Sequence, residues 1–324
     1  MAVRIVSYNI LVPIYAEQVD YYDKCDPKYL KTDYRWNLIQ NQFEREITKY
    51  ENTVVCIQEL CLSLLPKLEI FFRRMNYSLF HNLYGGEWND YMGVGIAIPL
   101  SMQLDDISFV KIGDYIRSVC KKWENRMDQN QDVSCENTEE VPDPWEAAMD
   151  RSNTLICMKV TINKRPLCIG TYHMPCMYKY PDIMAIHASI VKDLVFKYAS
   201  GCNVILAGDF NFEPTTACYS ELTKTGFPAG SFPKSKVYEV SYWPNTEQIL
   251  KSAYREKNGS EPAYTNYSCT FDQPVYCETL DYIFFAGQMT VDDVLNLPDR
   301  PSGRAYPDET NPSDHLLIAA SFRF

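Results

Sequence analysis

The chain is organised around short apolar runs that end in side chains able to bind a metal or transfer a proton. In the clearest case, residues 203–211, an apolar strand ends at Asp209 and Asn211. Residues two apart in an extended chain face the same side, so this carboxylate and this carboxamide are directed to one place. The pattern recurs at Asn9, Glu59, His173 and Asp281, and at Ser313-Asp314-His315 before the last apolar run. So many endings of this kind in one chain indicate an active site.

Helical and extended patterns alternate along the chain. Apolar residues three or four apart predict amphipathic helices over 36–49, 61–75 and 183–198. Apolar, β-branched runs predict strands over 3–8, 53–58, 77–80, 93–98, 154–161, 166–172, 203–207, 280–285 and 316–323. This order predicts a layered α/β protein with a mixed sheet or a sheet sandwich.

The chain of 324 residues, 46% of them hydrophobic, is expected to form one domain over 1–324. One segment departs from the alternating pattern, near 121–150, where Asp, Glu, Asn and Gln are frequent. We expect an acidic surface insertion there, which Trp145 could anchor or which could act as a lid.

Composition excludes several classes of protein. A net charge of −11 argues against binding nucleic acid by broad electrostatics, so a nucleic-acid substrate must be held locally. No apolar run reaches the roughly 18 residues of a membrane span, and no apolar signal region precedes the first strand, which makes a cytoplasmic or nuclear location the default. The 12 cysteines lack CxxC pairs, and Cys56, Cys157 and Cys168 lie within apolar runs. Buried reduced thiols are therefore favoured over disulfides or a zinc site.

The polar strand endings suit a hard divalent cation. Glu59 and Asp314 offer carboxylate oxygens, while Asn9 and Asn211 offer neutral ones. Such a set fits Mg²⁺ or Mn²⁺ better than zinc, which prefers Cys and His. A hard divalent cation in turn fits phosphate chemistry.

The remaining endings can supply the other requirements of phosphodiester hydrolysis. Asp209 could orient and deprotonate a water, with Asn211 holding a phosphoryl oxygen. His315, if fixed by a carboxylate such as Asp281, would be a cationic donor to the phosphate, and His173 a second one. A single Asn or Asp after a strand more often forms a turn, so the hypothesis depends on their occurring together. By contrast, His187 lies in a helical pattern and is expected to be structural.

Together, these residues resemble the pattern of a known family. The endonuclease/exonuclease/phosphatase superfamily is matched over essentially the whole chain by Asn9, Gln58-Glu59, His173, Gly208-Asp209-Phe210-Asn211, Leu280-Asp281-Tyr282 and Ser313-Asp314-His315. Within it, the chain looks like the carbon-catabolite-repressor type of deadenylase, a group with nocturnin-like, Angel-like and 2',5'-phosphodiesterase-like members. The segments that carry this closer likeness are 7–11, 250–254, 264–267 and 281–284.

The resemblance implies a four-layer αββα sandwich of the DNase I-like type, with the site at one end of two packed sheets. It implies an Mg²⁺-dependent 3'–5' exoribonuclease that shortens adenosine-rich RNA 3' ends and releases 5'-AMP, with Mn²⁺ as a substitute ion. It also implies that Glu59 binds the metal, with Asn9 and Asp314 nearby, and that Asp209 is the general base. Asn211 would be a phosphate and substrate ligand, and His315, held by Asp281, a phosphate ligand. His173 would contact the transition state.

The chain departs from the deadenylase pattern where the base would be read. Pro175 occupies the place of that group's second histidine, and Tyr178 that of its adenine-stacking proline. Phe271, in a long loop before Asp281, is a candidate for stacking on a base. The chain also has no leucine-rich repeats for recruitment.

Other functions stay open on these residues. One is a phosphatase or phosphodiesterase acting on RNA ends or small molecules, such as a 2',3'-cyclic phosphate or 2',5'-oligoadenylate. A DNA-repair endonuclease is less compatible with the charge. The non-enzyme alternative is an RNA-binding pseudoenzyme, which the full set of expected catalytic residues disfavours.

Overall fold

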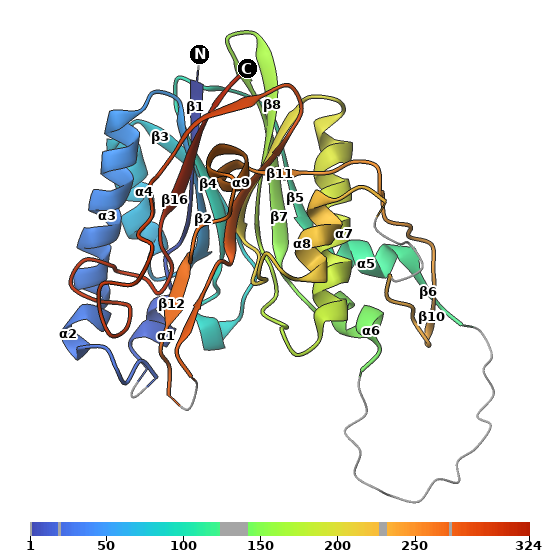
Figure 1. Cartoon of the computed structure of the whole chain (residues 1–324), viewed down its shortest axis with the longest axis horizontal. Coiled ribbons are helices and arrows are strands. Elements are labelled where there is room, and N and C mark those ends of the chain that lie inside the picture. Colours follow the sequence, from blue (N-terminus) through green and yellow to red (C-terminus); the bar gives the residue numbers. More distant parts are fainter. Residues whose placement is uncertain (1, 19–20, 124–141, 227–231, 272–273) are drawn as a thin grey trace, which may run out of the picture.

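The computed structural model describes residues 2–18, 21–123, 142–226, 232–271 and 274–324 (Figure 1). Most of the predicted acidic insertion, 124–141, lies outside the described residues. Its flanks are described: β6 (Cys120–Lys122) precedes the gap and α6 (Pro144–Met149) follows it. Trp145 is buried and its indole nitrogen donates to the carbonyl oxygen of Pro233 at 2.9 Å, which fixes α6 after the gap.

Two mixed sheets form the centre of the molecule (Figure 1). The first sheet has the order β15-β16-β1-β2-β4-β3. Its strands are β15 (Thr290–Val294), β16 (Ile318–Arg323), β1 (Ala2–Asn9), β2 (Thr53–Leu60), β4 (Gly93–Pro99) and β3 (Tyr77–Leu83). The second sheet has the order β11-β14-β9-β8-β7-β5. Its strands are β11 (Lys251–Ser252), β14 (Asp281–Ala286), β9 (Asn203–Asp209), β8 (Arg165–His173), β7 (Thr154–Ile162) and β5 (Gln103–Lys111).

The sheets pack face to face over a shared apolar core. Val3 and Ile5 of β1 and Ile96 of β4 pack in the same cluster as Ile169 of β8 and Ile205 of β9. These strands are buried on both faces, which explains their near-continuous apolar runs.

Helices cover the outer faces of both sheets (Figure 1). Trp36, Ile39 and Phe43 of α3 pack against the outer side of the first sheet, as does α4. The second sheet is covered chiefly by α7, with α5, α6 and α8 beside it. These helices are α3 (Thr32–Lys49), α4 (Leu65–Arg74), α5 (Ile112–Val119), α7 (Pro181–Ala199) and α8 (Ala217–Thr223), while α9 (Ala253–Asn258) contacts β14 of the second sheet and β15 of the first. The result is the four-layer sandwich that the resemblance implied.

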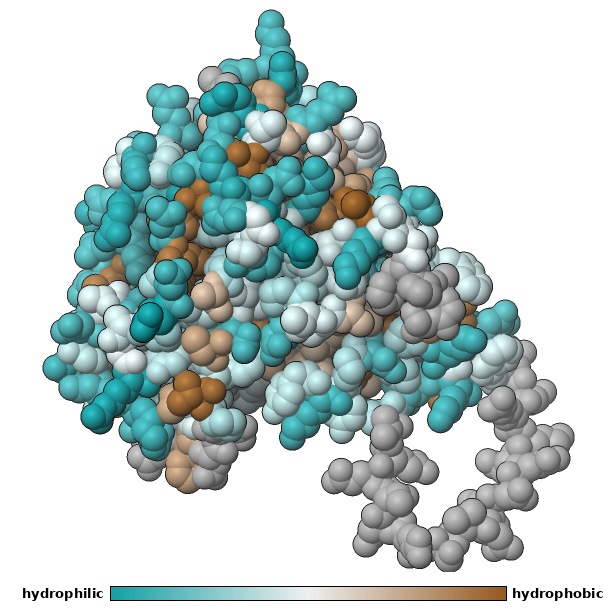
Figure 2. All heavy atoms as spheres, viewed as in Figure 1, coloured by the Kyte–Doolittle hydropathy of each residue, from teal (hydrophilic) through white to brown (hydrophobic). Residues whose placement is uncertain are grey.

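Smaller elements surround this frame. They are α1 (Pro13–Ala16), α2 (Pro27–Leu30), the short 3₁₀ helix η1 (Glu87–Asn89), and two small ribbons that pair β6 with β10 (Tyr238–Val240) and β12 (Asn266–Ser268) with β13 (Tyr276–Glu278). In the space-filling view, hydrophilic residues cover most of the face shown, with hydrophobic ones interspersed (Figure 2).

All the predicted strands and helices are found, with ends that shift by a few residues. The helix predicted from 61 begins only at Leu65, where Pro66 stands in its first turn. The edge strands β5, β11 and β15 were not predicted; β5 mixes exposed with half-buried residues and has no apolar run.

The cysteines of the described residues have free thiols, and Cys56, Cys157 and Cys168 are buried, as predicted. In addition, no helix of this part of the chain has both the length and the apolar character that a bilayer span requires.

Candidate active site

Strand register brings the predicted residues of the second sheet into one row. His173, at the end of β8, is paired with Asp209, at the end of the parallel β9, and Asp209 is paired with Asp281, at the start of the antiparallel β14. Close backbone approach helps to form this row, because a Cβ on Gly208 would lie 1.9 Å from the carbonyl oxygen of Tyr172. Only glycine fits there, which explains the Gly-Asp order at the end of β9.

Glu59 is presented by a β-bulge. The pairing of β2 with β4 shifts register between Gln58 and Leu60, and Glu59, between them, has φ 57°. A left-handed backbone is uncommon for a glutamate and is typically found where a structure positions a functional side chain. Here it leaves the side chain half-buried, with the backbone N–H of Val12 donating to Oε2 at 2.8 Å.

Asn9 joins the two sheets at the site. Its Nδ2 donates to Oε1 of Glu59 at 3.0 Å and to Oδ2 of Asp209 at 2.9 Å. Its Oδ1 accepts from the backbone N–H of Leu11 at 3.0 Å. Both side-chain ends of this fully buried residue are thereby used. In this orientation the amide would have to turn over for Asn9 to bind a metal directly through oxygen.

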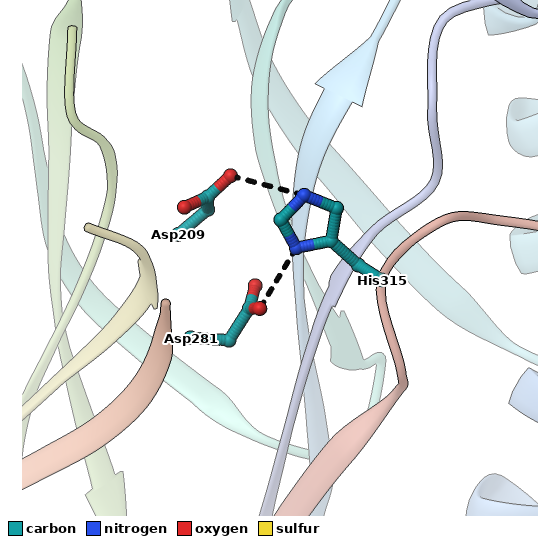
Figure 3. A group of neighbouring side chains, drawn as sticks. All are labelled: Asp209, Asp281 and His315. Carbon is teal, nitrogen blue, oxygen red and sulfur yellow. Dashed lines mark hydrogen bonds and ion pairs between the residues drawn. The ribbon is translucent and has the colours of Figure 1, made fainter. Parts of the chain in front are cut away.

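Asp209 is faced by both predicted histidines. Its Oδ2 lies 3.6 Å from Nε2 of His173 and 3.6 Å from Nε2 of His315. Nδ1 of His315 donates to Oδ2 of Asp281 at 2.8 Å, and Figure 3 shows this histidine between the two carboxylates. His173 is also oriented, because the hydroxyl of Tyr84 lies 3.2 Å from its Nδ1. Both rings therefore direct Nε2 towards the same carboxylate.

Burial and charge act in opposite directions on His315. Burial lowers the pKa of this histidine, but the negative charges of Asp281 and Asp209 raise it more, so that its pKa lies well above 6.5. His315 is then protonated at neutral pH and can donate from both ring nitrogens. Each ring nitrogen of His315 already faces a carboxylate, at 2.8 Å for Nδ1 and 3.6 Å for Nε2. Although ligand atoms of Asp209, Asp281 and His315 lie within 4.8 Å of one another, we interpret this group as a proton-transfer and anion-binding group.

The other carboxylates fit a hard cation better. Among the residues that the structure describes, neither Glu59 nor Asp314 forms an ion pair with Lys, Arg or His. Both are held by neutral donors instead, Glu59 as described above and Asp314 by the hydroxyl of Tyr22 at 3.0 Å. Carboxylates that form no ion pair with a cationic side chain suit Mg²⁺ or Mn²⁺, which oxygen ligands bind. Glu59 and Asp314, with Asn9, are the residues that could hold such an ion.

Asn211 and Asp314 enter the site from loops. Asn211, with φ 51°, donates its backbone N–H to Oδ1 of Asp209 at 2.9 Å and its Nδ2 to the carbonyl oxygen of Met174 at 2.9 Å. Next to Asp314, Ser313 Oγ donates to the carbonyl oxygen of Asn9 at 2.8 Å. These bonds tie the loops after β8 and β9 to each other, and the segment before β16 to the end of β1.

Several residues that support the site were not identified from the sequence. Arg35 of α3 is buried and donates to the carbonyl oxygens of Leu11 at 2.6 Å and Pro312 at 2.5 Å, and also to that of Ile10. It thus connects the loop after Asn9 with the loop before Asp314. Arg35 stands just before the helix predicted over 36–49 and four residues before its apolar Ile39, and this spacing was a usable signal.

Thr265, Tyr22 and Tyr84 were also missed as supports. Oγ1 of Thr265 donates to Oδ2 of Asp281 at 2.7 Å and accepts from the backbone N–H groups of Leu280 and Asp281, each at 2.9 Å. Burial and the charges of Glu59 and Asp209 raise the pKa of Tyr84, which keeps its hydroxyl protonated. No sequence pattern distinguished these hydroxyls from the chain's other Tyr and Thr residues.

The two predicted base-binding residues lie outside this network. Tyr178 is 67% exposed and Phe271 57% exposed, and neither takes part in the hydrogen bonds and ion pairs that join the buried site residues. The backbone N–H of Phe271 donates to the carbonyl oxygen of Tyr21 at 2.8 Å. Their roles stay predictions. His187 is fully buried between the hydroxyl of Tyr172 and the carbonyl oxygen of Ala148, as expected of a structural histidine.

The sequence matches a family model. The model for the Endonuclease/Exonuclease/phosphatase family matches residues 6–315. Human 2',5'-phosphodiesterase 12 is 26% identical over 351 residues, which cover 99% of this chain and 52% of that protein. Carbon catabolite repressor protein 4 homolog 1 of Arabidopsis thaliana is 24% identical, over 98% of this chain and 57% of that protein. The chain therefore spans about half the length of these curated relatives.

Solved structures share the fold. The structure of ANGEL2, described as a 2',3'-cyclic phosphatase in complex with adenosine-2',3'-vanadate, has a TM-score of 0.71 at 20% identity and covers 99% of this chain and 95% of that one. The human Nocturnin catalytic domain has a TM-score of 0.64 at 18% identity and covers 100% of this chain and 94% of that one.

Proposed function

The chain belongs to the endonuclease/exonuclease/phosphatase family, and on that premise we propose that it is a metal-dependent phosphodiesterase that hydrolyses RNA. One observation carries the proposal: Oδ2 of buried Asp209 lies 3.6 Å from Nε2 of both His173 and His315, beside the Asn9–Glu59 pair. A general base, two donors for a phosphate and a carboxylate site for a cation are the parts that phosphodiester hydrolysis requires.

In the proposed reaction Asp209 takes the proton of a water whose oxygen attacks phosphorus. The P–O bond to the departing 3' oxygen breaks and this oxygen takes a proton from solvent, so that the products are a 5'-phosphorylated nucleotide and a shortened chain with a 3'-hydroxyl. His315, protonated and held by Asp281, donates from Nε2 to a phosphoryl oxygen, and His173 donates beside it. Asn211 contributes a further polar contact to the phosphate. These donors stabilise the charge that develops in the transition state.

Glu59 and Asp314, with Asn9, would hold the divalent ion. Bound there, Mg²⁺ would neutralise phosphoryl charge and lower the pKa of an attacking water. The half-buried Glu59 carboxylate, fixed by Asn9 and by the backbone of Val12, is the principal ligand in this proposal.

For the substrate we propose an adenosine-rich RNA 3' end, shortened in the 3'–5' direction with release of 5'-AMP, in the cytoplasm or the nucleus. The likeness to nocturnin and to carbon catabolite repressor protein 4 homologues supports this choice. A second candidate is a 2',5'-linked oligoadenylate. It is favoured by the likeness to 2',5'-phosphodiesterase 12 over 99% of this chain and by Pro175 and Tyr178, which depart from the deadenylase pattern.

The test uses 5'-labelled oligoadenylates with 3',5' or 2',5' linkages, a 3',5'-linked oligocytidylate, and an RNA ending in a 2',3'-cyclic phosphate, with and without Mg²⁺. Stepwise Mg²⁺-dependent shortening of the 3',5'-linked oligoadenylate alone supports the deadenylase. Preference for the 2',5' linkage selects the second candidate. Removal of the cyclic phosphate alone replaces both with a phosphatase acting on RNA ends, and cleavage of none of them contradicts the phosphodiesterase proposal.

A further inference from the structure

Three aromatic side chains form a row beside the candidate active site. The ring centroid of Tyr15 lies 6.5 Å from that of Trp88 and 6.5 Å from that of Tyr21, with interplanar angles of 38° and 36°. The three residues come from separate segments, Tyr15 from α1, Tyr21 from the turn that follows it and Trp88 from η1 between β3 and β4. We call Trp88, Tyr15 and Tyr21 the aromatic row.

The inner end of the aromatic row reaches the residues proposed to hold the metal. The ring centroids of Tyr21 and Tyr22 lie 5.1 Å apart, and the hydroxyl of Tyr22 donates to Oδ2 of Asp314. Val12 connects Tyr15 to Glu59: its backbone N–H donates to Oε2 of Glu59 at 2.8 Å, and its carbonyl oxygen accepts from the backbone N–H of Tyr15 at 3.1 Å. A polymer whose phosphate is cleaved at Asp209 could therefore extend along this row.

The outer end of the row is open. Trp88, which forms this end, is 69% exposed, although large aromatic side chains are usually well buried. The loop that presents Trp88 is held in place: the buried Asn89 accepts from the backbone N–H of Gly86 at 2.9 Å, and Leu62 N–H donates to the carbonyl oxygen of Asp90 at 3.0 Å. An exposed ring on a fixed loop can bind with little loss of conformational entropy.

The hairpin of β12 and β13 borders the row, because Phe271 near its tip bonds the backbone of Tyr21. Figure 1 shows α1 and β12 together at the end of the sandwich opposite the two termini. The aromatic row thus lies where the strands deliver the site residues.

We propose that the aromatic row binds the nucleobases of a single-stranded substrate, with Trp88 as its outermost stacking surface. This inference rests on the proposed phosphodiesterase function, since the row leads to the site of cleavage. Every base presents a flat π-face, so that stacking on aromatic rings tolerates different sequences. For a chain of net charge −11, stacking also supplies affinity that general attraction to phosphates cannot.

The test measures binding of a fluorescently labelled single-stranded oligoadenylate, with Mg²⁺, to the full chain carrying Asp209→Asn so that the probe is not cleaved. Trp88→Ala should weaken binding about tenfold, within the range found when one base–aromatic stack is removed. Trp88→Phe should recover part of the loss. Trp243→Ala is the matched control: Trp243 is 79% exposed and lines a hollow beside Asp193 and Lys197 of α7, on the helices outside the second sheet.

Equal affinities for the Trp88→Ala and Trp243→Ala proteins would overturn the inference, and Trp88 would then be a candidate contact for a protein partner. Turnover of bis(4-nitrophenyl) phosphate by the unmodified chain tests the proposed function separately. If that diester and the oligonucleotides are left intact while Trp88→Ala still weakens binding, the phosphodiesterase proposal fails and the aromatic row stands as a nucleic-acid-binding surface.

Discussion

Asp281 determines which nitrogen of His315 faces the centre of the site. Oδ2 of Asp281 accepts from Nδ1 of His315 at 2.8 Å, so Nε2 is directed at Asp209, 3.6 Å away. The same carboxylate accepts from Thr265. A buried carboxylate that orients a histidine and stabilises its cation is a recurring arrangement in enzymes. Here it would keep a positive donor ready for a phosphate.

The pH dependence of catalysis should therefore change when Asp281 is replaced. The raised pKa of His315 means that activity requiring its protonated form is lost only as the pH rises through that pKa. Asp281→Asn removes a charge that raises the pKa, so the alkaline limb of the kcat profile should move to lower pH. The profile is measured with an oligoadenylate, and Asp114→Asn, on the exposed side of α5, is the control. An unmoved alkaline limb would mean that His315 does not act as the cationic donor.

Asp209→Asn should leave the fold intact and remove the general base. The amide is nearly isosteric with the carboxylate and can keep the contact with the backbone N–H of Asn211. We expect kcat to fall about 10²- to 10⁴-fold, the usual contribution of general acid–base catalysis. Circular dichroism and thermal unfolding verify the fold, and turnover at saturating Mg²⁺ measures the effect. Wild-type turnover in this variant would assign the base to another residue.

Glu59→Gln should weaken metal binding specifically. The substitution keeps the size of the side chain but removes the charge that a hard cation requires. Mn²⁺ affinity, measured by calorimetry on the protein without substrate, should decrease about tenfold or more, and the Mg²⁺ concentration for half-maximal activity should rise with it. Glu69→Gln, on α4, is a control for loss of a glutamate charge. If Mn²⁺ binds both variants as it binds the parent chain, Glu59 is not the ligand.

The sequence predicted the frame, and it predicted which polar residues would lie together at the strand ends, for a physical reason. Strands such as β1, β8 and β9 are covered on both sides, and their apolar runs end where a polar side chain such as Asn9, His173 or Asp209 can meet its neighbours. That signal is local and periodic, so it is readable from a single sequence. Edge strand β5 has neither property and was missed.

The supports of the site depend on contacts between distant segments. Tyr22 reaches Asp314 across 292 positions and Tyr84 reaches His173 across 89, and no periodicity predicts such pairs. The bulge at Glu59 could not be predicted from the sequence either, because it arises from the register between β2 and β4 rather than from the residue itself. Exposed Tyr178 and Phe271 were inferred from alignment to a family pattern alone, without a packing constraint.

Arg35 offers a test of one such long-range support. Arg35→Met would leave the backbone carbonyl groups of Ile10, Leu11 and Pro312 without their buried donor. We expect the free energy of unfolding to fall by about 3 kcal/mol or more, since each of the three unpaired buried carbonyl groups costs about 1–3 kcal/mol. The Mg²⁺ requirement should rise as well, because the loops carrying Asn9 and Asp314 lose their connection. Arg45→Met, exposed on the same helix, is the matched control. Destabilisation without a change in the Mg²⁺ requirement would make Arg35 purely structural.

His187 gives a prediction about stability that is independent of the active site. Burial lowers its pKa to about 4, with the bond to Ala148 opposing the shift, whereas an unfolded histidine titrates near 6.5. The unfolded chain therefore binds the proton first, and stability should fall as the pH drops from about 6.5 towards 4. At 1.36 kcal/mol for each pH unit, about 2 kcal/mol should be lost between pH 7 and pH 5. Urea unfolding of the parent chain and of His187→Leu measures this as a difference in slope. The variant should be less stable at pH 7, because Tyr172 and Ala148 lose their partner, yet less sensitive to acid; equal slopes would show that His187 is not held neutral.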